Sequence, residues 1–170
     1  MKRILTIALL AFAFSMGAQT KTDIPAYRSK GYAGSVSFTD QYIVWLGFDT
    51  SHGYMFNEHH YLGGGLGFFL VPIEVIPPTI AHAYVKYKSY WFKRKNTPTA
   101  GLKAGYCMPV TYRGEGSGFK FMGAFEMEPN IGWDWGLKSG KGLSLSLGAT
   151  LLMTEWHTFV MPKLSFGINF

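Results

Sequence analysis

The sequence predicts an all-β fold, an eight-stranded antiparallel up-and-down transmembrane β-barrel, and three observations lead to it. Hydrophobicity alternates with a period of two along most of the chain, which is the pattern of strands with two different faces. Charged residues make up only 15% of the 170 residues, aromatic residues make up 17%, and 21 glycines with 8 prolines argue against a helical bundle. The connections are too short for a crossover helix, so neighbouring strands should pair antiparallel.

The first eighteen residues have the pattern of a cleavable export signal. Two basic residues precede an apolar stretch from Ile4 to Phe14, and the small residues Gly17 and Ala18 follow at the expected cleavage point. The apolar stretch is shorter than the roughly 20 residues that a membrane-spanning helix needs. We therefore expect three regions, a cleaved signal peptide at 1–18, an N-terminal periplasmic segment at 19–30 and a β-barrel at 31–170.

Eight segments carry the strand pattern, and turn residues bound each of them. They are 31–39, 42–56, 61–70, 81–92, 100–109, 121–137, 143–154 and 159–170. Pro129 and Pro162 stand inside two of these segments, where each removes a ladder hydrogen bond and predicts a bulge or a strand end. An even number of strands places both termini at one end of the barrel.

One face of every segment is apolar and carries no Asp, Glu, Lys or Arg. In chain order it consists of Tyr32, Val36, Phe38; Tyr42, Val44, Leu46, Phe48, Tyr54, Phe56; Leu62, Leu66, Phe68, Leu70; Ala81, Ala83, Val85, Tyr87, Trp91; Ala100, Leu102, Ala104, Tyr106, Met108; Phe121, Phe125, Met127, Ile131, Trp133, Trp135; Leu143, Leu145, Leu147, Ala149, Leu151; and Leu164, Phe166, Ile168, Phe170. A face of this size and aromatic content favours contact with lipid.

The opposite face carries Gly, Ser, Thr and charged residues, among them four acids and four lysines. An eight-stranded barrel has an interior just wide enough for side chains, and buried charges need partners. We therefore expect the polar face to point inward and an ion-pair network to plug the interior. Its predicted members are Asp49, Lys86, Lys88, Lys103, Glu126, Glu128, Asp134 and Lys163.

Aromatic residues are expected at the two levels where a barrel meets lipid headgroups. On the side of the termini, the predicted girdle consists of Tyr32, Tyr54, Phe56, Trp91, Trp133, Trp135 and Phe170. The opposite level would collect Phe38, Tyr42, Phe68, Tyr106 and Phe121.

Three features carry a resemblance to a known family. They are the export signal, the strand end at 52–57 that turns into the glycine-rich 61–67, and a last strand that ends on Phe170. On these features residues 27–170 resemble the small eight-stranded outer-membrane β-barrel proteins of Gram-negative bacteria, with OmpA/OmpX-like architecture, and their uncharacterised single-domain relatives.

The resemblance implies a location and a set of partners. It implies a monomeric barrel in the bacterial outer membrane, in contact with membrane lipid and lipopolysaccharide. It also implies that the barrel-insertion machinery reads an assembly signal in the last strand, made of Phe166, Ile168 and Phe170. The basic residues of the expected barrel are scattered, so no nucleic-acid partner is expected.

The expected function is a structural or interaction role in the membrane, with no catalysis and no cofactor. One alternative is a lipid-modifying enzyme, an acyltransferase or deacylase, for which Glu155 and His157 with Ser117 or Thr158 are the candidate residues. The other is a lipocalin-like small-ligand binder, in which the apolar face would point inward.

Metal binding and disulfide formation are not expected. The five histidines, His52, His59, His60, His82 and His157, show no zinc-site spacing with Cys or carboxylates. The single cysteine, Cys107, can form no internal disulfide and is interpreted as a buried small apolar residue. The run of glycines at 63–67 is expected to relieve crowding inside a small barrel.

Overall fold

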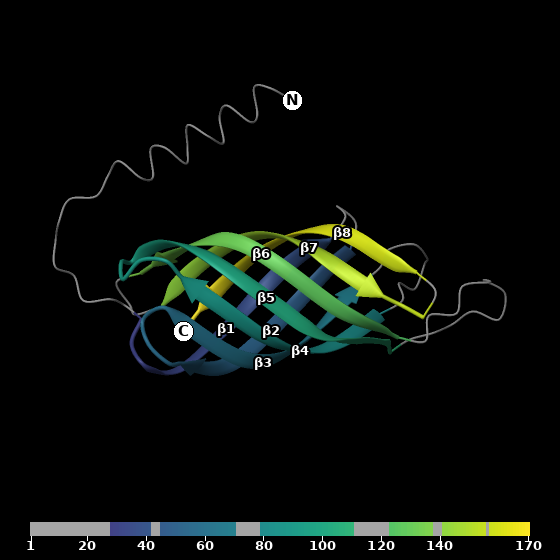
Figure 1. Ribbon diagram of the computed structural model, residues 1–170, viewed down its shortest axis with the longest axis horizontal. Helices are drawn as coiled ribbons and strands as arrows, with labels where there is room; N and C mark the ends of the chain where they lie inside the picture. Colours follow the sequence, from purple (N-terminus) through teal and green to yellow (C-terminus); the bar gives the residue numbers. More distant parts are fainter. Residues whose placement is uncertain (1–27, 42–44, 71–78, 111–122, 138–140, 156) are drawn as a thin grey trace, which may run out of the picture.

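The chain forms one closed antiparallel barrel in the computed structural model, which describes residues 28–41, 45–70, 79–110, 123–137, 141–155 and 157–170 (Figure 1). The strands are β1 (Gly31–Gln41), β2 (Trp45–Met55), β3 (His60–Leu70), β4 (Thr79–Tyr90), β5 (Asn96–Pro109), β6 (Ala124–Gly136), β7 (Gly142–Met153) and β8 (Thr158–Asn169). Each strand pairs with the next, and β8 pairs with β1, which confirms the predicted strand number and antiparallel closure. The described ranges contain no helix long and apolar enough to cross a membrane.

The two ends of the barrel differ in what lies there. The C-terminus lies at the end where β2, β4 and β6 finish, and β1, β3, β5 and β7 finish at the opposite end (Figure 1). We call these the terminal end and the loop end. The predicted signal peptide at 1–18 and most of the segment at 19–30 fall outside the described residues.

The largest difference from the predicted strand bounds concerns β5. This strand begins at Asn96, four residues before the start of the predicted segment 100–109, and so includes Pro98. Pro98 pairs with Trp133 of β6, and on its other side β4 has already ended at Tyr90. A proline is tolerated there because no full ladder runs along that side of it.

Pro129 and Pro162 produce neither a bulge nor a strand end, so that prediction was wrong. Both residues lie inside their strands, β6 and β8. The pairing of β6 with β7 stops at Met127 and resumes at Asn130 in the same register, so no extra residue is inserted. The missing N–H of Pro129 interrupts the ladder locally while neighbouring pairs hold the strand in place.

The register around the barrel sets which residues meet inside it. Following paired residues from strand to strand, starting at Gly31, leads back to β1 at Gln41, ten positions further along. Such a stagger tilts the strands against the barrel axis and, with the strand number, fixes the barrel's radius. Side chains at quite different distances along their strands therefore lie at one level of the interior.

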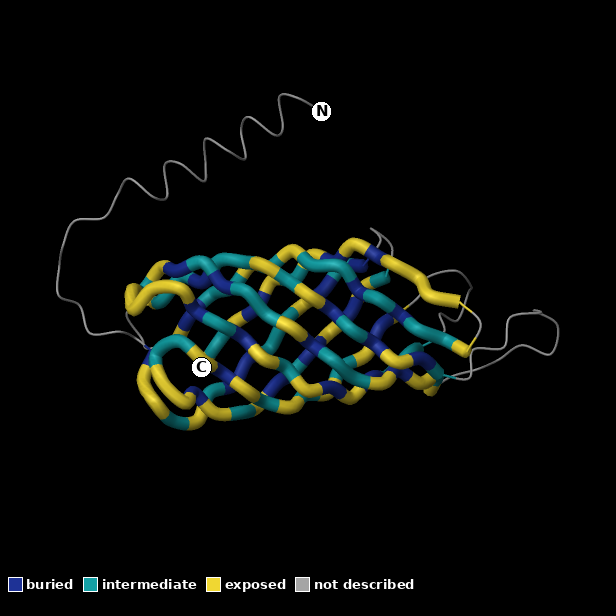
Figure 2. Tube along the Cα trace, in the orientation of Figure 1, coloured by how far each residue is buried: buried dark blue, intermediate teal, exposed yellow. Residues whose placement is uncertain are grey.

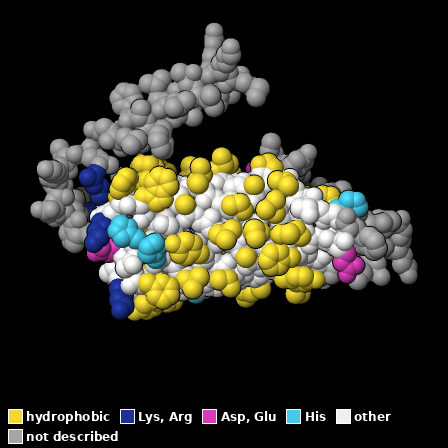
Figure 3. Space-filling model, in the orientation of Figure 1, with side chains coloured by type: hydrophobic (Ala, Val, Ile, Leu, Met, Phe, Trp, Pro, Cys, Tyr) yellow, Lys and Arg dark blue, Asp and Glu magenta, His cyan; other side chains and the backbone are white. Residues whose placement is uncertain are grey.

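The two faces of the strands separate as the alternation predicts. Large apolar side chains on the outer face are half-buried or exposed, with Leu66 at 64% and Ile131 at 63% exposure, whereas Glu126 and Asp134 on the inner face are at 0%. Buried and exposed positions alternate along the strands in Figure 2. Figure 3 shows hydrophobic side chains covering the barrel wall, with charged side chains and histidines gathered toward its ends.

Two apolar clusters pack inside the barrel, one toward each end. Near the loop end, Cys107 packs with Ala124, Leu152 and Met161. Near the terminal end, Met55, Tyr61 and Tyr90 form the second cluster. The charged residues of the inner face lie mostly between these clusters, where ion pairs are shielded from water and stronger than at a surface.

Candidate functional site: the barrel interior

The centre of the barrel holds a compact network of charged side chains. We call it the central network; its members are Asp49 from β2, His82 from β4, Lys103 from β5, Glu126 and Glu128 from β6, and Lys163 from β8. All six are at most 5% exposed. Lys103 lies opposite Glu128 in the β5–β6 ladder, whereas the contacts to Asp49 and Lys163 cross the lumen.

Two lysines hold the three carboxylates of the central network together. Lys103 Nζ lies 2.5 Å from Glu126 Oε1, 2.9 Å from Glu128 Oε2 and 3.5 Å from Asp49 Oδ2. Lys163 Nζ lies 2.8 Å from Glu128 Oε2 and 3.3 Å from Asp49 Oδ2. Removing any one member would leave a buried charge without its full set of partners, which is costly.

His82 lies between two carboxylates of the central network. Its Nε2 is 2.6 Å from Asp49 Oδ1, and its Nδ1 is 2.8 Å from Glu126 Oε2. A neutral imidazole has a single N–H and can donate to only one of two ionised carboxylates. The two contacts therefore require one additional proton within the chain Asp49–His82–Glu126. The same proton balances three carboxylates against two lysines.

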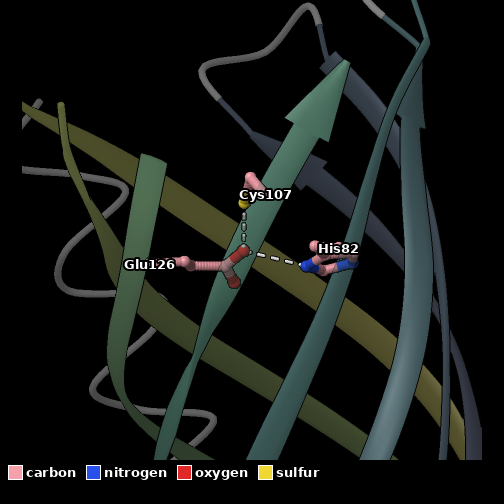
Figure 4. Close-up of side chains that lie close together, drawn as sticks. All are labelled: His82, Cys107 and Glu126. Atoms are coloured by element: carbon pink, nitrogen blue, oxygen red, sulfur yellow. Dashed lines mark hydrogen bonds and ion pairs between the residues drawn. The ribbon is translucent and has the colours of Figure 1, made fainter. Parts of the chain in front are cut away.

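Cys107 joins this chain at Glu126. Its Sγ donates to Glu126 Oε2 at 2.9 Å, so His82 and Cys107 converge on one carboxylate oxygen (Figure 4). Cys107 is buried, as predicted, but its surroundings are apolar on one side only.

Sequence reasoning missed this group of His82, Cys107 and Glu126, because zinc-site spacings are read along one segment. Here the three residues come from three adjacent strands. His82 pairs directly with Cys107, and Cys107 with Ala124, which precedes Glu126 by one inward position. The inward phase of β4, shared by Lys86 and Lys88, is the signal that could have placed His82 inside.

A second polar group lies nearer the terminal end. Lys88 Nζ is 2.7 Å from Asp134 Oδ1, and Asn169 Nδ2 donates to Asp134 Oδ2 at 2.9 Å. Arg28, just before β1, lies 3.9 Å from Asp134 and stacks on the ring of Tyr90 at 4.2 Å. We call Arg28, Lys88, Asp134 and Asn169 the terminal cluster. It ties the segment before β1 into the barrel mouth.

The structure does not bring Lys86 into an ion pair within the described part of the chain. Its Nζ donates to Ser35 Oγ at 3.5 Å. It borders a cavity of about 170 Å³ at the terminal end, which Arg28, Lys88 and Phe170 also line. The predicted network therefore divides into the central network, the pair Lys88–Asp134, and a lysine beside a polar cavity.

The seven residues of the predicted girdle all lie at the terminal end. Tyr32 and Tyr54 face each other across β1 and β2, and Phe56 follows the end of β2. Trp91 follows β4, Trp133 and Trp135 are among the last four residues of strand β6, and Phe170 follows β8. Of the opposite level, Phe38, Phe68 and Tyr106 are exposed on the outer face, while Tyr42 and Phe121 fall outside the described residues.

The candidate catalytic residues do not form a catalytic arrangement in the described part of the chain. His157 N donates to the hydroxyl of Thr154, and its ring lies against Phe159 rather than against a nucleophile. Ser117 falls outside the described residues. These contacts are those of a short turn between β7 and β8.

Comparison with known proteins gives matches by structure only. No family model matches the chain, and no curated protein matches it by sequence. The N-terminal β-barrel domain of Pseudomonas aeruginosa OprF is similar to it, with a TM-score of 0.61 and 12% identity over 84% of this chain and 98% of that chain. Neisserial surface protein A has a TM-score of 0.56 and 10% identity over 82% and 94%.

A de novo designed transmembrane β-barrel is also similar, with a TM-score of 0.54 and 10% identity over 84% of this chain and 96% of that chain. These similarities confirm the predicted resemblance in fold to small outer-membrane barrels. Because a designed barrel shares the fold, the fold by itself assigns no biological partner.

Proposed function

We propose that this protein is an integral outer-membrane barrel with a closed interior, and that its role is structural or one of interaction. The observation that carries the proposal is the central network. Its lysines reach carboxylates from β2 and β6 across the lumen, and its members are almost fully buried. An eight-stranded barrel filled in this way leaves no room for a continuous aqueous channel.

The outer surface supports placement in a membrane. Its large apolar side chains point away from the barrel. Exposing them to water would cost free energy, whereas exposing them to lipid would not. Barrel closure satisfies the strand edges, as a bilayer requires. The terminal end would then face the periplasm, with lipopolysaccharide around the loop end. The lipocalin-like alternative required the apolar face to point inward, whereas this face points outward.

Membrane placement is tested by fractionation combined with heat-modifiable gel migration. We expect the mature chain in the outer-membrane fraction, and we expect compact migration in SDS that boiling abolishes. A periplasmic species that stays soluble without detergent would contradict membrane placement.

The closed interior is tested separately in planar bilayers. We expect no stable large conductance from the folded wild-type protein, with an open porin as positive control. A double variant, Glu128→Ala with Lys163→Ala, removes a carboxylate and a lysine together and so keeps the charge balance. We expect it to conduct more than wild type. Stable large openings in the wild-type barrel would contradict the proposal, whatever the double variant does.

A further inference from the structure

Three side chains of types that bind metal ions converge on the side of the central network that faces the loop end. The ligand atoms of His82, Cys107 and Glu126 lie within 4.8 Å of one another, and all three residues are buried. They are held on the adjacent strands β4, β5 and β6, so the barrel itself fixes their spacing. Their side chains point toward one another in Figure 4.

The hydrogen bonds at this point hold two protons that a cation could replace. One is the thiol proton that Cys107 donates to Glu126 Oε2. The other is the additional proton of the chain Asp49–His82–Glu126, which can lie between His82 Nδ1 and the same Oε2. Both protons point at Glu126 Oε2. A cation that replaced them would therefore lie between a nitrogen, a sulfur and an oxygen atom.

We propose that His82, Cys107 and Glu126 form a binding site for one borderline divalent metal ion, of which Zn²⁺ is the representative. The ligands would be His82 Nδ1, the Cys107 thiolate and a Glu126 carboxylate oxygen. This mixture of nitrogen, sulfur and oxygen ligands suits Zn²⁺ and excludes hard cations such as Mg²⁺ and Ca²⁺. Three protein ligands would leave a fourth position for water.

The exchange conserves charge in the barrel. One divalent ion enters, and two protons leave for solvent, one from the thiol and one from the Asp49–His82–Glu126 chain. Lys103 and Lys163 keep their contacts with Asp49 and Glu128. Lys103 shares Glu126 with the metal, because it contacts Oε1 whereas the metal would take Oε2. Without this charge compensation, burying a dication would cost too much free energy.

The residues around the three ligands also match a metal site. Asp49 Oδ1 lies 2.6 Å from His82 Nε2, the nitrogen that would not bind the metal. A carboxylate in this position orients a metal-binding histidine and raises its basicity. The present contacts of Glu126 Oε2, 2.8 and 2.9 Å, would have to lengthen by about 0.5 Å to match tetrahedral bond lengths.

Co²⁺ is the probe that tests the site, because a bound thiolate gives it a charge-transfer absorption band. The mature protein is refolded in detergent with chelator or with Co²⁺, and heat-modifiable migration selects folded material. We expect about one Co²⁺ per barrel, the thiolate band, and loss of the band when Zn²⁺ is added. A folded wild-type barrel that shows no band after refolding with Co²⁺ would overturn the proposal.

Cys107→Ser is the decisive variant because serine keeps the size and the donor of cysteine. We expect it to abolish the Co²⁺ band and to weaken Zn²⁺ binding by about tenfold or more. His82→Gln removes a second ligand and should have the same two effects. His157→Gln is the control: it changes a histidine in the β7–β8 turn and should leave the Co²⁺ band and the Zn²⁺ affinity unchanged. An unchanged Zn²⁺ affinity in folded Cys107→Ser would also refute the site.

Discussion

Two ion pairs of nearly equal length show how burial decides what a residue contributes. Lys88 and Asp134 lie 2.7 Å apart inside the barrel, and Lys93 and Glu58 lie 2.6 Å apart between the turns of the terminal end. The hydrogen bond from Lys93 holds the pKa of Glu58 below its usual value, but both partners are open to solvent. Solvent screens the exposed pair, whereas the buried pair has no alternative partner in water.

Neutralising one member of each pair should therefore give very different results. Asp134→Asn leaves Lys88 buried without a carboxylate and is expected to lower the free energy of unfolding by about 3 kcal/mol. Glu58→Gln is the matched control and should cause no measurable change. Urea unfolding in detergent, followed by tryptophan fluorescence, measures both. Equal losses in the two variants would show that burial does not govern these pairs.

At the scale of a single element, β3 shows why the sequence places glycine on alternate positions. A Cβ on Gly63 would meet the Tyr61 hydroxyl, and one on Gly65 would meet the ring of Tyr84. At Gly67 it would meet both Asp49 Oδ1 and His82 Nε2. The inward glycines therefore make room for aromatic rings and for the central network, as the sequence suggested.

Substituting an inward and an outward glycine of β3 separates this effect from general strand propensity. Gly67→Ala should displace the Asp49–His82 contact and lower the free energy of unfolding by about 2 kcal/mol, as overpacking does. Gly64→Ala points outward, where a Cβ lies 3.6 Å from its nearest neighbour, and should be neutral or slightly stabilising. The same urea unfolding measures both, and a neutral Gly67→Ala would contradict the packing argument.

At the scale of the whole molecule, the seam between β1 and β8 is where the barrel closes. This seam pairs seven residues of β1, whereas the β1–β2 hairpin pairs eleven. Phe170 extends the seam: its N–H donates to Gly34 O at 2.9 Å, and the Gly34 N–H donates to Phe170 O at 2.7 Å. Closure depends on the two ends of the chain meeting, which makes it the step with the greatest loop entropy.

The predicted assembly signal can be separated from simple apolar surface on β8. Phe170→Ala is expected to lower the amount of barrel assembled in the outer membrane of cells several-fold. Leu164→Ala changes an outward-facing residue of β8 with similar exposure, at 48% against 46% for Phe170, and should assemble normally. Both variants should fold in detergent, where no machinery is needed. Equal assembly of the two variants would remove the role assigned to Phe170.

The sequence by itself determined the local features of this barrel. Period-two alternation defined eight strands and sorted Leu66 and Ile131 outward and Glu126 and Lys163 inward, because each strand residue takes its face from its position alone. Only the tertiary structure decided which inward residues meet. It joined His82 with Cys107 and Glu126, and it left Lys86 beside a cavity. Those contacts depend on register and on the ten-residue stagger of closure, which are properties of all eight strands together and are not encoded in the spacing within any one of them.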